Sequence, residues 1–252
     1  MSTLSPEQID DMKVCGKILK NALDQTVLVL KAGVTTIALD RIAEESIVNA
    51  GARPSFKNYF VEGVGSYPSS LCVSINDEVV HGIPNESRVI KNGDVVSLDL
   101  GAEYHGVCTD MARTIIVGEA TEQIKSLVNT TRICLENAIK EVAVGKNIGN
   151  IGAAVEKTAL AAGFAVIKDY VGHGIGEKPH MAPSIPNFGK YGSGPKILDC
   201  TALAIEPMIT LSAEYTTPAD DGWTAKTEDG SISAHFEHTV VIENGVVTVV
   251  TL

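Results

Sequence analysis

The stretch VVSLDLGAEYHGVCTDMARTIIVG (95–118) decides the fold. Apolar and β-branched residues run along both of its arms, and a polar segment separates them. This pattern predicts a hairpin of two buried strands. A turn centred near Tyr104-His105 would place Asp99 directly opposite Asp110 on one sheet face.

Two carboxylates that face each other in a buried hairpin need an explanation. Like charges directly opposite across a ladder repel, and ionised carboxylates are costly to bury. Either one of the two is protonated or a cation lies between them. A solvated hairpin face is the alternative, and the apolar flanks of Asp99 and Asp110 argue against it.

The second half of the chain supplies similar groups. Glu206 ends the apolar run Ala-Leu-Ala-Ile, Glu237 lies within AHFEHTVVI, and His173 lies in GHGIG. Each of them alone is typical of a structural polar residue. Four carboxylates and one imidazole together suit Mn(II), Fe(II), Co(II) or Zn(II). Because four carboxylates can neutralise two divalent ions, the set predicts a dinuclear metal centre.

The order of motifs indicates an internal duplication. GVTTIALDRIAEESIVNAG (33–51) aligns with GKNIGNIGAAVEKTALAAG (145–163), and each is followed by an HGI tripeptide, an acid-bearing strand and a second acid before a β-branched run. We therefore expect one domain over 1–252, built from pseudo-repeats of about 1–120 and 121–252 that face each other across a shared axis.

Local signals predict the remaining elements. Ser5, Pro6 and Gln8 form a capping box that begins a helix. The other expected elements are a helix from about Thr36 to just before Gly51, helices at about 121–141 and 149–162, and a hairpin around Asn244-Gly245.

Composition limits the class of protein. The chain has 252 residues, of which 44% are hydrophobic, and a net charge of -11 disfavours direct binding to nucleic acid or to an anionic membrane. It contains no apolar run long enough for a transmembrane helix and no signal-peptide pattern. Five cysteines without a CxxC pair argue against disulfides and favour a cytoplasmic location.

These motifs resemble those of type I methionine aminopeptidases, in the pita-bread metallopeptidase family. The segments that carry the resemblance are NDEVVHGIP (76–84), GDVVSLDLGAEYHGVCTDMART (93–114), YVGHGIGEKPHMAPSIPNFG (170–189), LAIEPM (203–208), DGWT (221–224) and ISAHFEHTVVI (232–242). The resemblance implies an α+β fold of two pseudo-symmetric α/β halves, with an antiparallel sheet, helices outside and the metal centre between the halves. It also implies an enzyme that removes the N-terminal methionine from nascent proteins with a small second residue.

The resemblance assigns a role to each matching position. The five metal ligands would be Asp99, Asp110, His173, Glu206 and Glu237, with Asp110 and Glu237 bridging two divalent ions. The catalytic residues would be His81, His180 and Glu206, of which both histidines also contact substrate. The methionine pocket would be lined by Tyr67, Cys72 and Trp223, and a monovalent cation would bind near Asn76 and Ser233.

The implied chemistry is metal-assisted hydrolysis of a peptide bond. Two divalent ions lower the pKa of water, so that hydroxide is available as a nucleophile near neutral pH. Glu206 would carry the proton to the leaving amine. His180 would donate to the developing oxyanion, and His81 would form a hydrogen bond near the scissile amide.

Some positions depart from the family pattern. Pro179 replaces a bulky apolar or aromatic residue before His180, and the aromatic residue slightly upstream of Tyr67 is absent, with Val64 nearby. These changes concern the shape of the methionine pocket and leave the expected metal ligands intact.

Other interpretations of the same motifs predict different sequence features. A type II enzyme carries an insertion that is absent between His180 and Glu206, and prolidases and Xaa-Pro aminopeptidases carry an added N-terminal domain. A non-catalytic binding protein of this fold has typically lost metal ligands.

The expected partners are nascent polypeptide N-termini, with ribosome association, no direct contact with nucleic acid or membrane, and a monomeric state.

Overall fold

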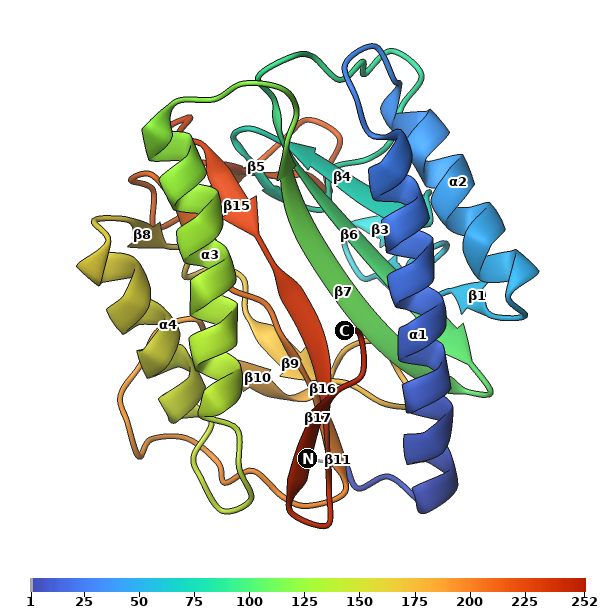
Figure 1. The fold of residues 1–252 in the computed structure, drawn as a ribbon, viewed down its shortest axis with the longest axis vertical. Helices are drawn as coiled ribbons and strands as arrows, with labels where there is room; N and C mark the ends of the chain where they lie inside the picture. Colours follow the sequence, from blue (N-terminus) through green and yellow to red (C-terminus); the bar gives the residue numbers. More distant parts are fainter. Residues whose placement is uncertain (1) are drawn as a thin grey trace.

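A computed structural model describes residues 2–252 (Figure 1). Its helices are α1 (Pro6–Val29), α2 (Thr36–Asn49), α3 (Glu122–Lys140) and α4 (Gly149–Ala161). The main sheet contains β1 (Arg53–Pro54), β4 (Leu71–Ile75), β6 (Val95–Tyr104), β7 (Val107–Ile116), β9 (Gly172–Gly174), β10 (Met181–Ile185), β11 (Thr201–Ile205), β16 (Glu237–Glu243) and β17 (Val246–Val249). Smaller sheets contain β2 (Phe60–Val61), β3 (Gly65–Ser66), β5 (Glu78–Val80), β8 (Ala165–Val166), β12 (Met208–Thr210), β13 (Thr216–Pro218), β14 (Ala225–Thr227) and β15 (Ser233–His235).

The main sheet joins the two halves of the chain edge to edge. Its order is β1-β6-β7-β16-β11-β9-β10, with β4 on β6 and β17 on β16. β7 of the first half pairs with β16 of the second, antiparallel, at Glu237↔Ala112 and His238↔Met111. This seam sets an acid-bearing strand from each half side by side.

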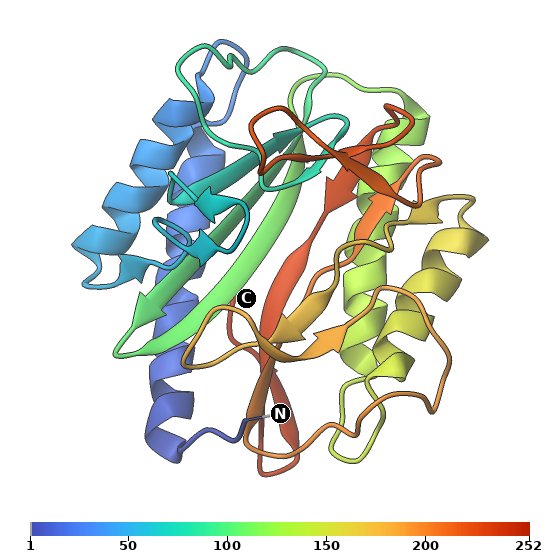
Figure 2. The same cartoon turned by 180° about the vertical axis from the view of Figure 1, so that it is seen from behind.

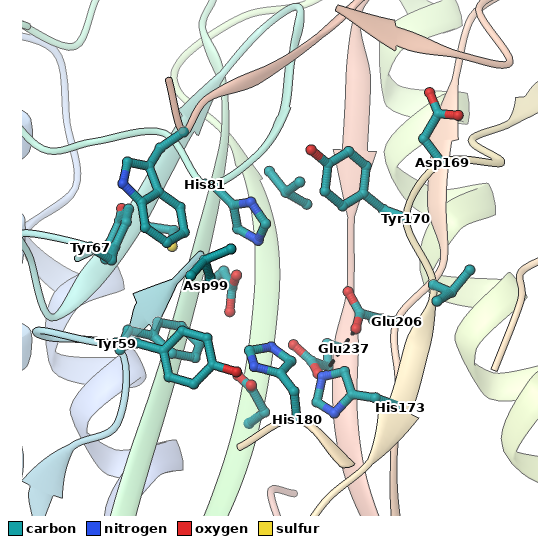
Figure 3. Close-up of a pocket in the computed structure, with 17 residues that line it drawn as sticks. Tyr59, Tyr67, His81, Asp99, Asp169, Tyr170, His173, His180, Glu206 and Glu237 are labelled. Carbon is teal, nitrogen blue, oxygen red and sulfur yellow. Dashed lines mark ion pairs between the residues drawn. The ribbon is translucent and has the colours of Figure 1, made fainter. Parts of the chain in front are cut away.

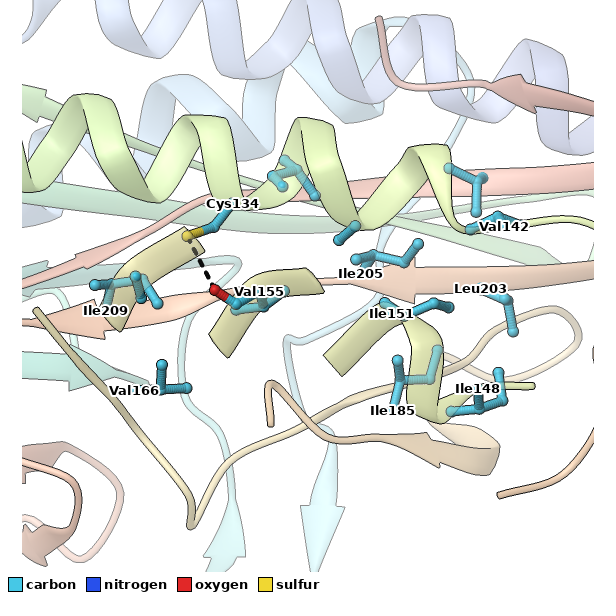
Figure 4. Close-up of a cluster of buried hydrophobic side chains, with 14 of the residues drawn as sticks. Cys134, Val142, Ile148, Ile151, Val155, Val166, Ile185, Leu203, Ile205 and Ile209 are labelled. Carbon is cyan, nitrogen blue, oxygen red and sulfur yellow. Dashed lines mark hydrogen bonds between the residues drawn. The ribbon is translucent and has the colours of Figure 1, made fainter. Parts of the chain in front are cut away.

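The helices cover one face of the sheet. α1 and α2 lie over the first half and α3 and α4 over the second (Figure 1), whereas the opposite face, seen in Figure 2, carries strands and loops. Apolar side chains fill the space beneath each helix pair; Figure 4 shows the cluster under α3 and α4, where the Cys134 thiol donates to the carbonyl of Val155. Leu98 and Leu100 belong to the cluster beneath α1 and α2, so Asp99 between them faces away from the helices.

The register of the β6–β7 hairpin corrects the expected one. The turn lies at His105-Gly106, with φ of 48° and 81°, and these left-handed angles suit a two-residue hairpin turn. Asp99 is consequently opposite Ala112, and Asp110 is opposite Gly101. The two carboxylates are therefore diagonal neighbours on one face and not directly opposite each other.

The other expected elements are confirmed to within one or two residues. Ser5 and Gln8 form the capping box of α1, and Asn244-Gly245 forms the turn between β16 and β17, with φ of 52° and 76°. Within residues 2–252, none of the helices combines the length and the hydropathy needed to span a bilayer.

Candidate metal centre

All ten residues expected at the site line one cavity of about 320 Å³. They are Tyr67, Cys72, His81, Asp99, Asp110, His173, His180, Glu206, Trp223 and Glu237. Figure 3 shows Glu206, Glu237 and His173 at one side of this cavity, Tyr59 and Tyr67 at the other, and Asp99 between them. The structure thus brings the predicted residues of both halves together on the sheet face away from the helices.

Three buried carboxylates form the first part of the centre. Asp99 on β6, Asp110 on β7 and Glu237 on β16 each offer an oxygen within 4.8 Å of the others. Burial raises the pKa of Asp99 to about 7, and it raises the pKa of Asp110 and Glu237 well above the ordinary range. Asp99 Oδ1 and Glu237 Oε1 are buried without a hydrogen-bond partner among residues 2–252. Orphaned acceptors in this arrangement suit a cation.

His173 and Glu206 form the second part. The Nδ1 of His173 lies 3.0 Å from the carbonyl of Gly174, which can only accept, so Nδ1 carries the hydrogen of the neutral ring. The lone pair of Nε2 then faces Glu206 Oε1 at 3.3 Å. Two acceptors at this distance need a proton or a cation between them. Burial lowers the pKa of His173 to about 3 and raises that of Glu206 to about 8.

The potential donor sets overlap. Besides the carboxylate trio, one set contains His173, Glu206 and Glu237, and another contains Asp110, His173 and His180. Asp110, His173 and Glu237 each belong to two of these sets, so neighbouring potential sites share donors, and the two carboxylates among them have two oxygens each to offer. Carboxylate and neutral imidazole donors are those that divalent Mn, Fe, Co and Zn accept. The residues present therefore fit a divalent metal centre.

Two further histidines border the carboxylates. The exposed His180 stacks edge-on against His173, with ring centroids 4.4 Å apart. His81 adopts φ of 61°, and its ring lies 5.4 Å from that of Tyr170. Burial lowers the pKa of His81 to about 4. The His180 residue is exposed overall, but its ring packs against Tyr59 and His173, and the resulting loss of water lowers its pKa as well. Both rings are therefore neutral near pH 7 and can donate one hydrogen bond each.

An apolar compartment adjoins the centre. Phe56, Tyr67 and Cys72 form a buried cluster, with Ile83 and Trp223 packed against it. The Tyr67 hydroxyl donates to the carbonyl of Gly82 at 3.0 Å, so the polar tip of this ring is satisfied inside the wall. Such a compartment suits a flexible, unbranched apolar side chain.

The structure alters what the departures from the family pattern mean. Tyr59 lines the cavity, and its ring centroid lies 5.1 Å from that of His180, so an aromatic group is present upstream of Tyr67. Val64 is 46% exposed and, like Pro179, is not among the lining residues.

Sequence reasoning missed several residues of the site. Phe56, Tyr59 and Tyr170 line the cavity, and His235 Nε2 lies 3.4 Å from Glu206 Oε2. Tyr170 lies three residues before His173, and His235 lies two residues before Glu237, so proximity to a predicted ligand was the available signal for these two. No local pattern marks Phe56 or Tyr59.

The predicted monovalent-cation residues also come together. The backbone N–H of Ser233 donates to the carbonyl of Asn76 at 2.8 Å, and Asn76 adopts φ of 60°. The side chain of Asn76 donates to Asp94 at 3.0 Å, and the Ser233 hydroxyl is buried without a partner among the described residues.

Comparisons with known proteins agree on the family. The model of metallopeptidase family M24 matches residues 10–244. The chain is 43% identical over 235 residues to methionine aminopeptidase of Clostridium perfringens, covering 93% of this chain and 92% of that relative. The crystal structure of methionine aminopeptidase from Thermotoga maritima superimposes with a TM-score of 0.95 at 41% identity, covering 100% of this chain and 99% of that one. Prolidase from Pyrococcus furiosus, at 19% identity and a TM-score of 0.76, covers 99% of this chain and 65% of its own and shares the fold alone.

Proposed function

Because the chain belongs to metallopeptidase family M24, we propose that its site hydrolyses the peptide bond after an N-terminal methionine. The expected pita-bread fold is confirmed, and the chain is a metalloaminopeptidase. The observation that carries the proposal is a buried set of carboxylates beside an apolar compartment. Asp99, Asp110 and Glu237 lie buried together, and Phe56 and Tyr67 line the space next to them.

The family uses divalent metal, and five residues of this chain would hold it. Asp99, Asp110, His173, Glu206 and Glu237 supply enough donors for two ions of Co, Mn, Fe or Zn. When bound, the ions supply a Lewis acid and lower the pKa of water. A monovalent cation near Asn76 and Ser233 is a further part of the proposal, supported by the unpartnered Ser233 hydroxyl.

Glu206 is the proton carrier in this proposal. Its side chain is 13% exposed, and a carboxylate placed here can accept a proton from water and return it to a leaving group. It accepts the proton of the attacking water and gives it to the leaving amine. Its place beside His173 keeps it within the metal-ligating half of the cavity.

The two neutral histidines act on the peptide group. His180, an exposed residue that lines the cavity, donates to the oxyanion that develops from the scissile carbonyl. His81, on the side of Tyr170 and Trp223, forms a hydrogen bond with the scissile amide. Cys72, Tyr67 and Trp223 receive the methionine side chain.

The substrates proposed are the N-termini of nascent polypeptides with a small second residue. The chain would act in the cytoplasm as a monomer, in association with the ribosome. Prolidases are only distant neighbours in sequence, so an Xaa-Pro peptidase is not favoured. The chain has a potential ligand residue at all five expected positions, so a non-catalytic protein is not favoured either.

A peptide-release assay tests the proposal. Protein loaded with Mn(II), Fe(II), Co(II) or Zn(II) should release methionine from Met-Ala-Ser, with less release from Met-Leu-Ser and none from Ala-Pro peptides. Chelated protein and Asp110→Asn serve as controls and should be inactive. Release from Xaa-Pro peptides in preference to Met-Ala-Ser, or no release with any of the metals, would overturn the proposal. Elemental analysis of anaerobically purified protein identifies the metal that is retained.

A further inference from the structure

His235 is a buried imidazole for which neither the fold nor the ligand set accounts. It ends β15 and is 1% exposed, and both of its ring nitrogens are without a hydrogen-bond partner among residues 2–252. Its Nε2 lies 3.4 Å from Glu206 Oε2. Burying an unpaired polar ring costs stability, so a position that keeps one is a candidate for a functional role.

The backbone of His235 is held rigidly. Its N–H donates to the Thr114 hydroxyl at 2.8 Å, and that hydroxyl donates back to its carbonyl at 2.7 Å. Because the single Thr114 proton is thereby used, Ser97 Oγ donates to Thr114 Oγ1 across β6 and β7. β15 also pairs with β12 at Met208↔His235, two residues beyond Glu206. The backbone of His235 is thus held from both sides, near the backbone of Glu206.

The two imidazoles beside Glu206 differ in what they can donate. His173 holds its hydrogen on Nδ1, toward the carbonyl of Gly174, so its Nε2 is available only as a lone pair. The Nδ1 of His235 has no such partner among the described residues, so the hydrogen of its neutral ring is free to sit on Nε2. Glu206 then has an acceptor beside Oε1 and a donor beside Oε2.

We propose that His235 is a positioning residue, whose Nε2–H donates to Glu206 Oε2 and turns Oε1 toward His173 and the metal-ligating cluster. This inference rests on the proposed function only for the measurement of kcat; the measurements of metal affinity and of stability do not require turnover. Metal-binding carboxylates are commonly oriented by such outer partners, and hydrogen bonds of this kind are often long before ligands bind.

Three substitutions at this position separate a donor role from a packing role. His235→Leu fills the space without a donor, His235→Gln carries an amide N–H at the place of Nε2, and His235→Asn carries one at the place of Nδ1. For Met-Ala-Ser we expect kcat to fall about 10–100-fold in the Leu and Asn variants, with KM within about twofold of wild type. The Gln variant should stay within about threefold of wild type, because it retains the donor at the right distance. His105→Asn, at the exposed β6–β7 turn, is the matched control for loss of a histidine, because asparagine tolerates the φ of 48° at this position.

Metal affinity and metal-free stability provide readouts that need no turnover. Titration with Mn(II) by calorimetry should give an affinity about tenfold weaker in the Leu and Asn variants than in wild type and the Gln variant. The metal-free Leu variant should melt no lower than wild type, because it removes a buried ring whose Nδ1 has no partner among residues 2–252. Full kcat and full Mn(II) affinity in His235→Leu, or equal losses in the Leu and Gln variants, would overturn the proposal. Failure of wild type to release methionine would instead contradict the proposed function and leave the affinity series to decide the role of His235.

Discussion

Asp99 and Asp110 are diagonal neighbours on one face of the β6–β7 hairpin, and a small residue lies opposite each of them. Ala112 faces Asp99, and Gly101 faces Asp110. Small partners leave open the space above the strands, and Glu237 enters it from β16. The expected register was wrong by two residues along β7, and a shift of two keeps every side chain on its own face. The pair of carboxylates was therefore predicted correctly although their exact pairing was not.

Gly101 should not tolerate even one added methyl group. A Cβ there would lie 2.1 Å from Ser55 Oγ and 2.7 Å from a ring carbon of Phe56, which walls the apolar compartment. We expect Gly101→Ala to lower the free energy of unfolding by about 1–3 kcal/mol and to raise KM for Met-Ala-Ser. Urea denaturation and steady-state kinetics measure the two effects. Alanine is otherwise preferred to glycine in a strand, so an equal or higher stability would show that Phe56 moves away without cost.

Metal-free protein should lose stability as the pH rises. The pKa of Asp99 is about 7 and that of Glu206 about 8 in the folded state, both raised by burial from ordinary values near 4. Between about pH 4 and pH 8 the unfolded chain therefore ionises while the folded site holds its protons, and the folded state is disfavoured. Melting curves in a chelator across this range should show a falling Tm.

Two comparisons isolate the metal centre in that experiment. Asp99→Asn should flatten the decline, since it removes one of the groups that resists ionisation. Mn(II) at 100 times its Kd should restore about 2.7 kcal/mol at pH 7.5. A Tm that is unaffected by chelation at pH 7.5 would contradict a buried metal site.

Glu206→Gln should separate proton transfer from metal binding. The amide cannot carry a proton, so kcat should fall about 10²–10⁴-fold. The trio Asp99, Asp110 and Glu237 is untouched, and elemental analysis should still find at least one equivalent of metal. A near-normal kcat would exclude Glu206 as the proton carrier.

His180→Ala tests stabilisation of the oxyanion. Loss of one donor to a developing oxyanion typically lowers kcat by about 10²–10³-fold, and we expect this range with Met-Ala-Ser. Tyr59→Phe is a suitable control, because it keeps the ring that packs on His180 and removes only a hydroxyl. An effect confined to KM would instead indicate that His180 serves only to bind substrate.

The parts of the site that could be predicted are those with a local signature. Asp99 and Glu206 lie in or directly after an apolar strand, and His173 lies between glycines, so each stands out from its neighbours. Phe56 and Tyr59 lie in a segment of short strands and turns without periodicity. They reach the cavity through tertiary contacts, such as the bond from Ser55 N–H to the carbonyl of Gly101, and no sequence pattern encodes such contacts.

The pairing of β7 with β16, which joins the two halves, could not be predicted from local sequence for the same reason. Thr239 allows a test of how this contact positions Asp110. Its hydroxyl accepts from the Asp110 N–H and donates to the Asp110 carbonyl, both at 2.8 Å, just where the β7–β16 ladder ends. Thr239→Val keeps the shape but leaves both backbone groups of Asp110 unpaired in the interior, so we expect a loss of about 1–3 kcal/mol of unfolding free energy. Mn(II) affinity should fall as well, because this contact fixes the strand that presents the Asp110 carboxylate. Thr239→Ser retains the hydroxyl and should keep most of the metal affinity; equal Mn(II) affinity in the Val and Ser variants would show that β7 is positioned by the ladder alone.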